Sequence, residues 1–318
     1  MTSVLSESGG AQAFSLRPVG HARRRLLVEK VVKAILGAAA GVSVLVTVGI
    51  VLSLLEPTVE FFSKVSPLKF FGGANWSPLF DPPGYGVWAP IVASLQVTVI
   101  ALLIAVPFGL GAAFYLSEYA RPGVRRVVKP ILEILAGIPT VVFGFFALNF
   151  VNPNIVKKFW PIGDVGTFSV VSAGLVMGTM ILPTVASLSE DAMSAVPQSL
   201  RNGAYALAAT KREVCLKVVF RAGISGIVAA IVLGVSRALG ETMIVLLAAG
   251  NEPKLSLNPG EGMQTMTGFI GSAATGDLPV DSLDYKTIFA VGTVLFVVTL
   301  LLNTLSMRIV RRFREVYE

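Results

Sequence analysis

The stretch GVSRALGETM, residues 234–243, places an arginine and a glutamate in the middle of a long apolar segment. From Ala222 to Asn251 the chain carries no charge other than Arg237 and Glu241. An ionised side chain at the centre of a membrane-spanning helix costs about 2.5–3.5 kcal/mol on insertion scales, and such residues mark functional sites. The segment is therefore predicted to be a membrane span that carries a functional pair of charges.

Five further apolar segments accompany this one. Of the 318 residues, 54% are apolar and 14% are charged, a composition typical of a membrane protein. Each segment holds the roughly 20 residues that cross about 30 Å of hydrocarbon as a helix. The predicted fold class is all-α, a polytopic membrane protein with six transmembrane helices, preceded by a flexible tail, residues 1–25, and comprising residues 26–318. The predicted spans are residues 34–55, 87–116, 130–151, 166–188, 223–250 and 286–307.

The basic residues indicate the orientation of these spans. With the N-terminus inside, 19 of the 26 Lys and Arg residues fall in the tails and loops of the inner side, and six fall in the outer loops. Cytoplasmic loops carry the excess of Lys and Arg in membrane proteins. Both termini are therefore predicted to be cytoplasmic, and membrane lipid surrounds the spans.

The rarity of cysteine and histidine excludes several classes of function. The chain has one cysteine, Cys215, and one histidine, His21, too few for a disulfide framework or a His/Cys metal cluster. The predicted spans also lack the residues for a catalytic triad, and no GxxxxGK[ST] phosphate loop occurs. We therefore expect a non-catalytic membrane protein with no cofactor of its own and no nucleic-acid partner.

Two long outer loops, residues 56–88 and 250–284, are rich in Trp, Phe, Pro and Gly. Loops longer than about 15 residues are uncommon and are often functional. They predict an ordered docking or gating surface, with aromatic anchoring at the membrane interface as the alternative.

The inner loop, residues 190–221, predicts a short amphipathic helix that begins near Pro197. Its apolar residues recur at spacings of three and four: Leu200, Ala204, Leu207 and Ala208. A small apolar face presented to the cytosol indicates either a protein partner or a helix that lies flat on the lipid surface.

Arg237 and Glu241 are four residues apart, so on one continuous helix they would share a face and could pair. Arginine presents a permanently charged planar fork that binds oxyanions, phosphate above all, through two hydrogen bonds. We predict that both residues lie on a substrate pathway, with Glu241 neutralising Arg237 while the pathway is empty. The alternative is a staple between helices or subunits that never contacts substrate.

Two glycine and proline patterns predict local features of the spans. Gly137 and Pro139 interrupt the third span and predict a kink or break, which would expose the Thr140 hydroxyl to the pathway. Gly174 and Gly178 form a GxxxG pattern, which is typical of close helix packing.

Four stretches carry a resemblance to a known family. The chain after about residue 25 resembles the permease subunits, of the PstC type, of bacterial phosphate ABC transporters. The stretches are NWSPLFDPPGYG (75–86), IALLIAVPFGLGAAFYLSEYA (100–120), KPILEILAGIPTVVFGFFAL (129–148) and RALGETMIVLLAAGN (237–251).

This resemblance implies a MetI-like type I importer permease in the bacterial inner membrane. The implied partners are a second permease of the PstA type, two ATPase subunits of the PstB type that hold ATP-Mg, and a periplasmic phosphate-binding protein of the PstS type. The inner loop then holds a coupling helix for the ATPase, but Asn202, Ala208 and Arg221 stand where the family often has Glu, Gly and Pro. The implied coupling residues are Asn202, Ala204, Tyr205, Leu207, Ala208 and Thr210.

The expected function is therefore that of a permease subunit of an ATP-driven phosphate importer, which forms half of the translocation pathway. Two alternatives remain at this point: a permease for another oxyanion, because arginine also binds sulfate or molybdate, and a secondary transporter that moves protons on Glu133 or Glu241.

Overall fold

The computed structural model describes residues 19–161 and 163–312. The chain divides into two compact units, residues 1–53 and 54–318. Helix α1 (Val19–Lys64) includes the described residues of the first unit and continues to Lys64. It begins earlier than the predicted span 34–55, and its described apolar side chains are exposed as far as Ile50. The predicted tail, residues 1–25, lies outside the described residues up to residue 18, and it is helical rather than loose from Val19 onward.

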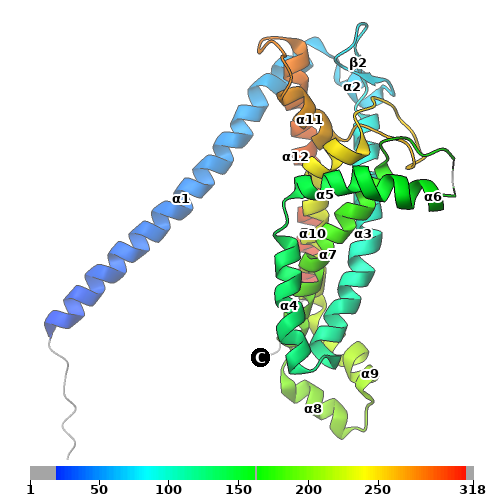
Figure 1. Ribbon diagram of the computed structural model, residues 1–318. Helices are drawn as coiled ribbons and strands as arrows, with labels where there is room; N and C mark the ends of the chain where they lie inside the picture. The colour runs from blue at the N-terminus through cyan, green and yellow to red at the C-terminus, as the bar shows by residue number, and fades with distance from the viewer. Residues whose placement is uncertain (1–18, 162, 313–318) are drawn as a thin grey trace, which may run out of the picture. The chain divides into compact units, whose positions relative to one another are not determined.

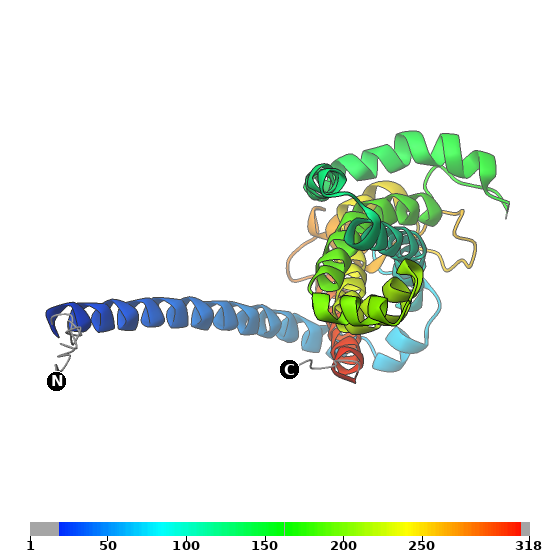
Figure 2. The same cartoon turned by 90° about the horizontal axis from the view of Figure 1, so that it is seen from below.

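The second unit is built around three neighbouring helices, α3 (Trp88–Phe114), α7 (Val170–Ser194) and α10 (Phe220–Gly240). Figures 1 and 2 show α3 and α10 beside α7, with α12 (Leu283–Arg312) on the far side of α10. Helix α7 is mostly buried, and its sequence is rich in Gly, Ala, Ser and Met. Small residues let membrane helices approach closely, which explains the central position of α7.

The predicted packing role of the GxxxG pair is confirmed. A Cβ atom placed on Gly174 would lie 2.7 Å from Cβ of Ile100 on α3. A Cβ atom on Gly178 would lie 2.7 Å from the carbonyl oxygen of Ala101. Both distances are shorter than van der Waals contact, so the two helices require glycine at these positions.

We expect Gly178→Ala to destabilise the protein by about 1–3 kcal/mol, because the added methyl group meets rigid backbone. The measurement is thermal unfolding of the purified protein in mild detergent. The matched control is Gly111→Ala on α3, where a Cβ atom has no neighbour within 4 Å. That control should unfold at the same or a higher temperature, since alanine favours helix over glycine. Equal unfolding temperatures for Gly178→Ala and the unaltered protein would contradict this packing.

The predicted break in the third span is confirmed. Helix α4 (Pro122–Ala136) ends beside Gly137, and α5 (Thr140–Phe146) begins after Pro139. The helix continues through η2 (Ala147–Val156) and α6 (Lys157–Phe159), and the two halves meet at 85°.

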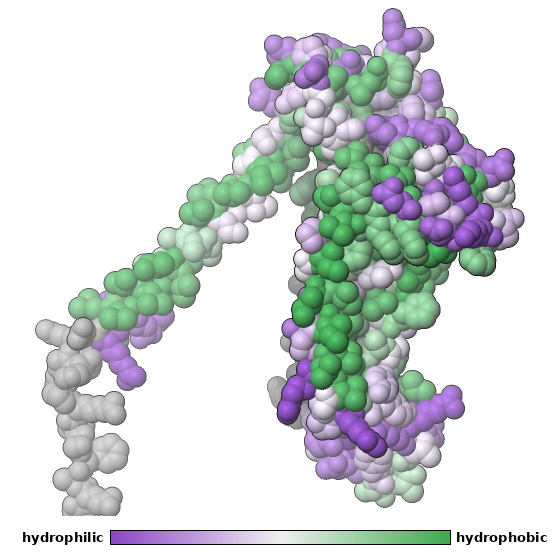
Figure 3. Space-filling model, viewed as in Figure 1, coloured by the Kyte–Doolittle hydropathy of each residue, from purple (hydrophilic) through white to green (hydrophobic). Residues whose placement is uncertain are grey.

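The predicted fifth span, residues 223–250, is not one continuous helix. Helix α10 ends at Gly240, Glu241 has extended backbone, and a second helical segment follows that includes η4 (Val245–Ala249). Within the described residues, five helices are long and apolar enough to cross a membrane, and six if the bent pair forms one span. Figure 3 shows one face of residues 54–308. Apolar residues cover the middle of this face, and polar residues gather toward its two ends.

The two loops predicted to be outer, residues 56–88 and 250–284, pack on each other at one end of this unit. They contribute α2 (Pro67–Gly72), the antiparallel pair β1 (Trp76–Ser77) and β2 (Gly84–Tyr85), and α11 (Met266–Ala274). Nε1 of the buried Trp76 donates to Oε1 of Gln264 at 2.7 Å, and its ring meets the edge of Phe269. Trp76 is therefore a core residue of an ordered cap and not an anchor at the lipid surface.

The other end holds the segment predicted to be an inner loop. Helix α3 continues there as η1 (Tyr115–Tyr119), and α8 (Gln198–Ala206), α9 (Lys211–Glu213) and η3 (Val214–Val219) lie between α7 and α10. Figure 1 shows α8 and α9 opposite α2, β2 and α11. The predicted loop, residues 190–221, begins too early, because α7 continues to Ser194.

Candidate functional site

Arg237 lies in the last turn of α10 and faces α7. Its side chain is half-buried, and Nη1 donates to Oγ1 of Thr184 at 3.0 Å. None of the ion pairs among the described residues includes Arg237. In this structure the guanidinium is held by a neutral hydroxyl, and its charge is not neutralised by a carboxylate within 4 Å.

The predicted pairing of Arg237 with Glu241 is wrong for this structure, because the helix ends between them. Oε1 of Glu241 accepts hydrogen bonds from the backbone N–H groups of Met243 at 3.0 Å and Ile244 at 3.3 Å. The side chain therefore caps the helical segment that follows, where a carboxylate also interacts favourably with the helix dipole. The carbonyl of Glu241 accepts from Oγ1 of Thr267 on α11 at 2.7 Å, which fixes the break from its other side.

Thr140 is the first residue of α5, directly after the break in the third span. Helix α5 packs on the segment that follows Glu241: a Cβ atom on Gly144 would lie 2.8 Å from Leu247 and 3.2 Å from the carbonyl of Met243. The two helix breaks are thus linked by packing. Among the hydrogen bonds of the described residues, none joins Thr140 itself to Arg237 or Glu241.

The predicted coupling residues lie on and just after α8. The helix begins after Pro197, as predicted. Ala204 is half-buried on the inner face of α8, the face that packs on an apolar cluster of the chain. Leu207 is 86% exposed, so it does not share that inner face, and Asn202, Tyr205 and Ala208 are also exposed. Thr210 accepts from the backbone N–H of Glu213 and begins α9.

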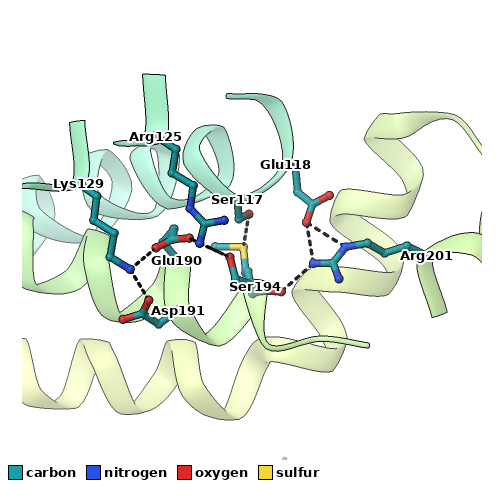
Figure 4. A network of polar contacts seen from close by, with 9 residues as sticks. Ser117, Glu118, Arg125, Lys129, Glu190, Asp191, Ser194 and Arg201 are labelled. Atoms are coloured by element: carbon teal, nitrogen blue, oxygen red, sulfur yellow. Dashed lines mark hydrogen bonds and ion pairs between the residues drawn. The ribbon is translucent and has the colours of Figure 1, made fainter. Parts of the chain in front are cut away.

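A polar network between α4 and α7 was not predicted from the sequence. Glu190 is fully buried, accepts from Arg125, and accepts from Nζ of Lys129 at 2.8 Å. Lys129 also bonds Asp191 at 2.5 Å, and Oγ of Ser194 donates to Glu190 at 2.8 Å. Figure 4 shows these side chains converging between the two helices. The same view contains a second pair, Arg201 with Glu118.

Residues 105–315 match the family described as binding-protein-dependent transport system inner membrane component. The chain belongs to this family. It is 35% identical over 292 residues to the probable ABC transporter permease protein YqgH of Bacillus subtilis, covering 91% of this chain and 93% of that protein. It is 31% identical to the phosphate transport system permease protein PstC of Mesorhizobium japonicum, covering 89% and 90% of the two chains.

Solved structures of ABC transporters show the same fold at low sequence identity. A bacterial ABC transporter involved in alginate import is similar with a TM-score of 0.54 at 16% identity, covering 84% of this chain and 96% of that one. An inward-facing MetNI methionine ABC transporter is similar with a TM-score of 0.54 at 18% identity, covering 72% and 95%. The predicted MetI-like permease fold and the PstC-type resemblance are confirmed. The chain is a multi-pass, non-catalytic permease component of an ABC importer.

Ala208 of this permease has an unusual backbone conformation. Its φ angle is 59°, in the left-handed region that favours glycine. The backbone N–H of Ala208 donates to the carbonyl of Tyr205 at 2.9 Å and closes the end of α8. A residue with a side chain is therefore strained at the position where glycine commonly ends a helix.

We expect Ala208→Gly to stabilise the permease by about 0.5–1 kcal/mol, because glycine adopts this conformation without strain. Ala206→Gly, two residues earlier on an exposed helical position, should destabilise it by about 0.5–1 kcal/mol instead. Thermal unfolding of the two variants gives the comparison. Destabilisation of similar size by both would contradict a strained turn at Ala208.

Proposed function

We propose that this chain is the permease subunit of an ATP-driven phosphate importer and forms half of the translocation pathway with a second, homologous permease of the PstA type. Two PstB-type ATPase subunits would hold ATP-Mg and dock on α8, and a PstS-type binding protein would deliver phosphate to the cap formed by the outer loops. The chain itself would hold no cofactor, and both termini would lie in the cytoplasm of a bacterial cell.

The observation that carries this proposal is the charge of Arg237. Its guanidinium has a hydroxyl partner on α7 and no carboxylate partner in the described structure. A half-buried cation in a membrane segment is costly unless it pairs or faces water, so a passing anion is its natural partner. The planar fork favours a tetrahedral oxyanion that can accept two hydrogen bonds at once.

Thr140, Glu241 and the two helix breaks support the same assignment. Irregular backbone at membrane depth is tolerated where it lies within protein or lines a watery cavity. The helical segments that follow the breaks at residues 137–139 and 240–242 pack on each other, and the second break directly follows the last turn of α10, which carries Arg237. Thr140 and Glu241 are accordingly proposed as pathway residues.

The test has two parts. Capture of the permease in mild detergent should recover an ATPase and a second permease, and a purified permease alone should hydrolyse no ATP. In vesicles that contain the complex, phosphate uptake should require ATP and persist when an ionophore abolishes the proton gradient.

Two outcomes would contradict the proposal. Uptake that follows the proton gradient would favour a secondary transporter. Competition of sulfate or molybdate with labelled phosphate at equal concentration would favour another oxyanion; the 35% identical relative is named without a substrate, so this comparison is needed.

A further inference from the structure

Arg201 is the buried charge of the exposed helix α8. Its side chain is 9% exposed, whereas its neighbours Asn202 and Tyr205 are exposed. Arg201 is the one buried residue of α8. The helix that we propose to meet the ATPase is therefore connected to the rest of the permease through one guanidinium and a small apolar face.

The guanidinium joins three elements at once. Nε and Nη2 donate to Oε1 of Glu118 on η1, at 3.3 Å and 3.0 Å. Nη2 also donates to the carbonyl of Met193 at 2.8 Å, and Nη1 donates to the carbonyl of Val196. Figure 4 shows Arg201 reaching from α8 to Glu118 and to the end of α7. A cation is also favourable there, because the last carbonyls of a helix carry partial negative charge.

These contacts fix the orientation of the Arg201 side chain as well as its position. Glu118 is itself buried, with its side chain 6% exposed, so neither partner can turn to water when the pair is formed. Arginine presents its donors in a rigid plane, and here the plane meets a carboxylate on one element and carbonyls on another. A lysine or a hydrogen-bonded amide could not hold all these acceptors together.

The end of α7 is held on a second side by α4. Ser194, one residue after Met193, donates to Glu190, which binds Arg125 and Lys129 of α4. Helix α4 leads directly to the 85° break before Thr140. A displacement of α8 is thus connected through Arg201 to α7, and through Glu190 to the helix that ends at the predicted pathway.

We propose that Arg201, through Glu118 and the carbonyls at the end of α7, is the positioning residue that transmits movement of α8 to the membrane helices. This inference rests on the proposed function, because it requires an ATPase docked on α8. Breaking the connection should leave α8 able to bind the ATPase but unable to move η1 and α7 with it. ATP hydrolysis then continues without driving transport.

The experiment uses the reconstituted complex with its ATPase, second permease and binding protein. Two variants test the connection, Arg201→Gln and Glu118→Gln. The matched control is Arg212→Gln, which removes an exposed cation with no hydrogen bond or ion pair among the described residues. Three quantities are measured: recovery of the complex, stimulation of ATP hydrolysis by the binding protein, and phosphate imported per ATP hydrolysed.

For the two variants we expect the complex to assemble and hydrolyse ATP, while stimulation and phosphate imported per ATP each fall by about tenfold, a coupling of ordinary size between linked sites. Arg212→Gln should change neither the stimulation of hydrolysis nor the phosphate imported per ATP. The double variant should be no worse than Arg201→Gln alone, because both changes break one connection. A purely structural role would lower recovery, hydrolysis and uptake together and leave both ratios unchanged, which would overturn the proposal.

Failure of the proposed function would be visible separately. If the unaltered complex imported no phosphate, the assignment of phosphate as its substrate would be wrong. Stimulation of hydrolysis by the binding protein would still decide the role of Arg201, since this readout needs no transported substrate. Stimulation in both variants equal to that of the unaltered complex would overturn the positioning role whatever the substrate is.

Discussion

Arg237→Gln is expected to abolish measurable phosphate uptake, a loss of roughly 100-fold, while the complex still assembles. A charged hydrogen bond to an oxyanion contributes about 1.5–3 kcal/mol, and glutamine keeps the polar contact but removes the charge. The half-buried position and the single hydroxyl partner, Thr184, leave the guanidinium available to a ligand. The measurement is uptake of labelled phosphate by vesicles that contain equal amounts of complex.

The matched variant is Arg237→Lys, which keeps the charge and removes the planar fork. We expect it to restore little uptake, because an ammonium group is a point charge and cannot form two parallel bonds to one oxyanion. Full activity with lysine would contradict bidentate binding. Loss of assembly in Arg237→Gln would indicate instead that Arg237 holds α10 to α7 and touches no substrate.

The sequence predicted the apolar spans and the positions where helices break, because both depend on local composition. Each of the five described helices that could cross a membrane overlaps one of the predicted spans. Pro139 explains the broken third span, since proline removes a backbone donor and fixes its own φ angle. These features need no information from distant parts of the chain.

The pairing of Arg237 with Glu241 failed because spacing was applied across a helix end. One helix ends at Gly240, and the carboxylate of Glu241 caps the helical segment that begins after Thr242. The order Gly240, Glu241, Thr242 is the sequence signal for this helix end. The apolar segments on both sides favoured one continuous helix instead.

The network of Glu190 could not be predicted from local pattern. Its cationic partners, Arg125 and Lys129, lie more than 60 residues earlier in the chain, and the charges at 190 and 191 resembled the start of a loop. The buried carboxylate is stable within α7 because α4 supplies two cations and Ser194 supplies a hydroxyl. Periodicity along one segment carries no information about such a contact.

Glu190→Ala is expected to destabilise the permease by about 3 kcal/mol, at the lower end of the cost of breaking a buried ion pair. The lower end applies because Arg125 is 40% exposed and Lys129 is 28% exposed, so both cations regain some hydration when the carboxylate is removed. The measurement is thermal or denaturant unfolding of the purified permease in one detergent at fixed pH and salt.

Asp191→Ala is the matched control, since it removes the adjacent carboxylate, which also binds Lys129. Asp191 is 55% exposed, and exposed ion pairs contribute about 1 kcal/mol or less, so this variant should unfold close to the unaltered protein. Equal destabilisation by the two variants would show that the buried carboxylate of Glu190 contributes no more to stability than the exposed carboxylate of Asp191. A large effect at Glu190 alone would mean that this carboxylate holds the first half of α4 to the end of α7, so that α4 is fixed before the break that precedes Thr140.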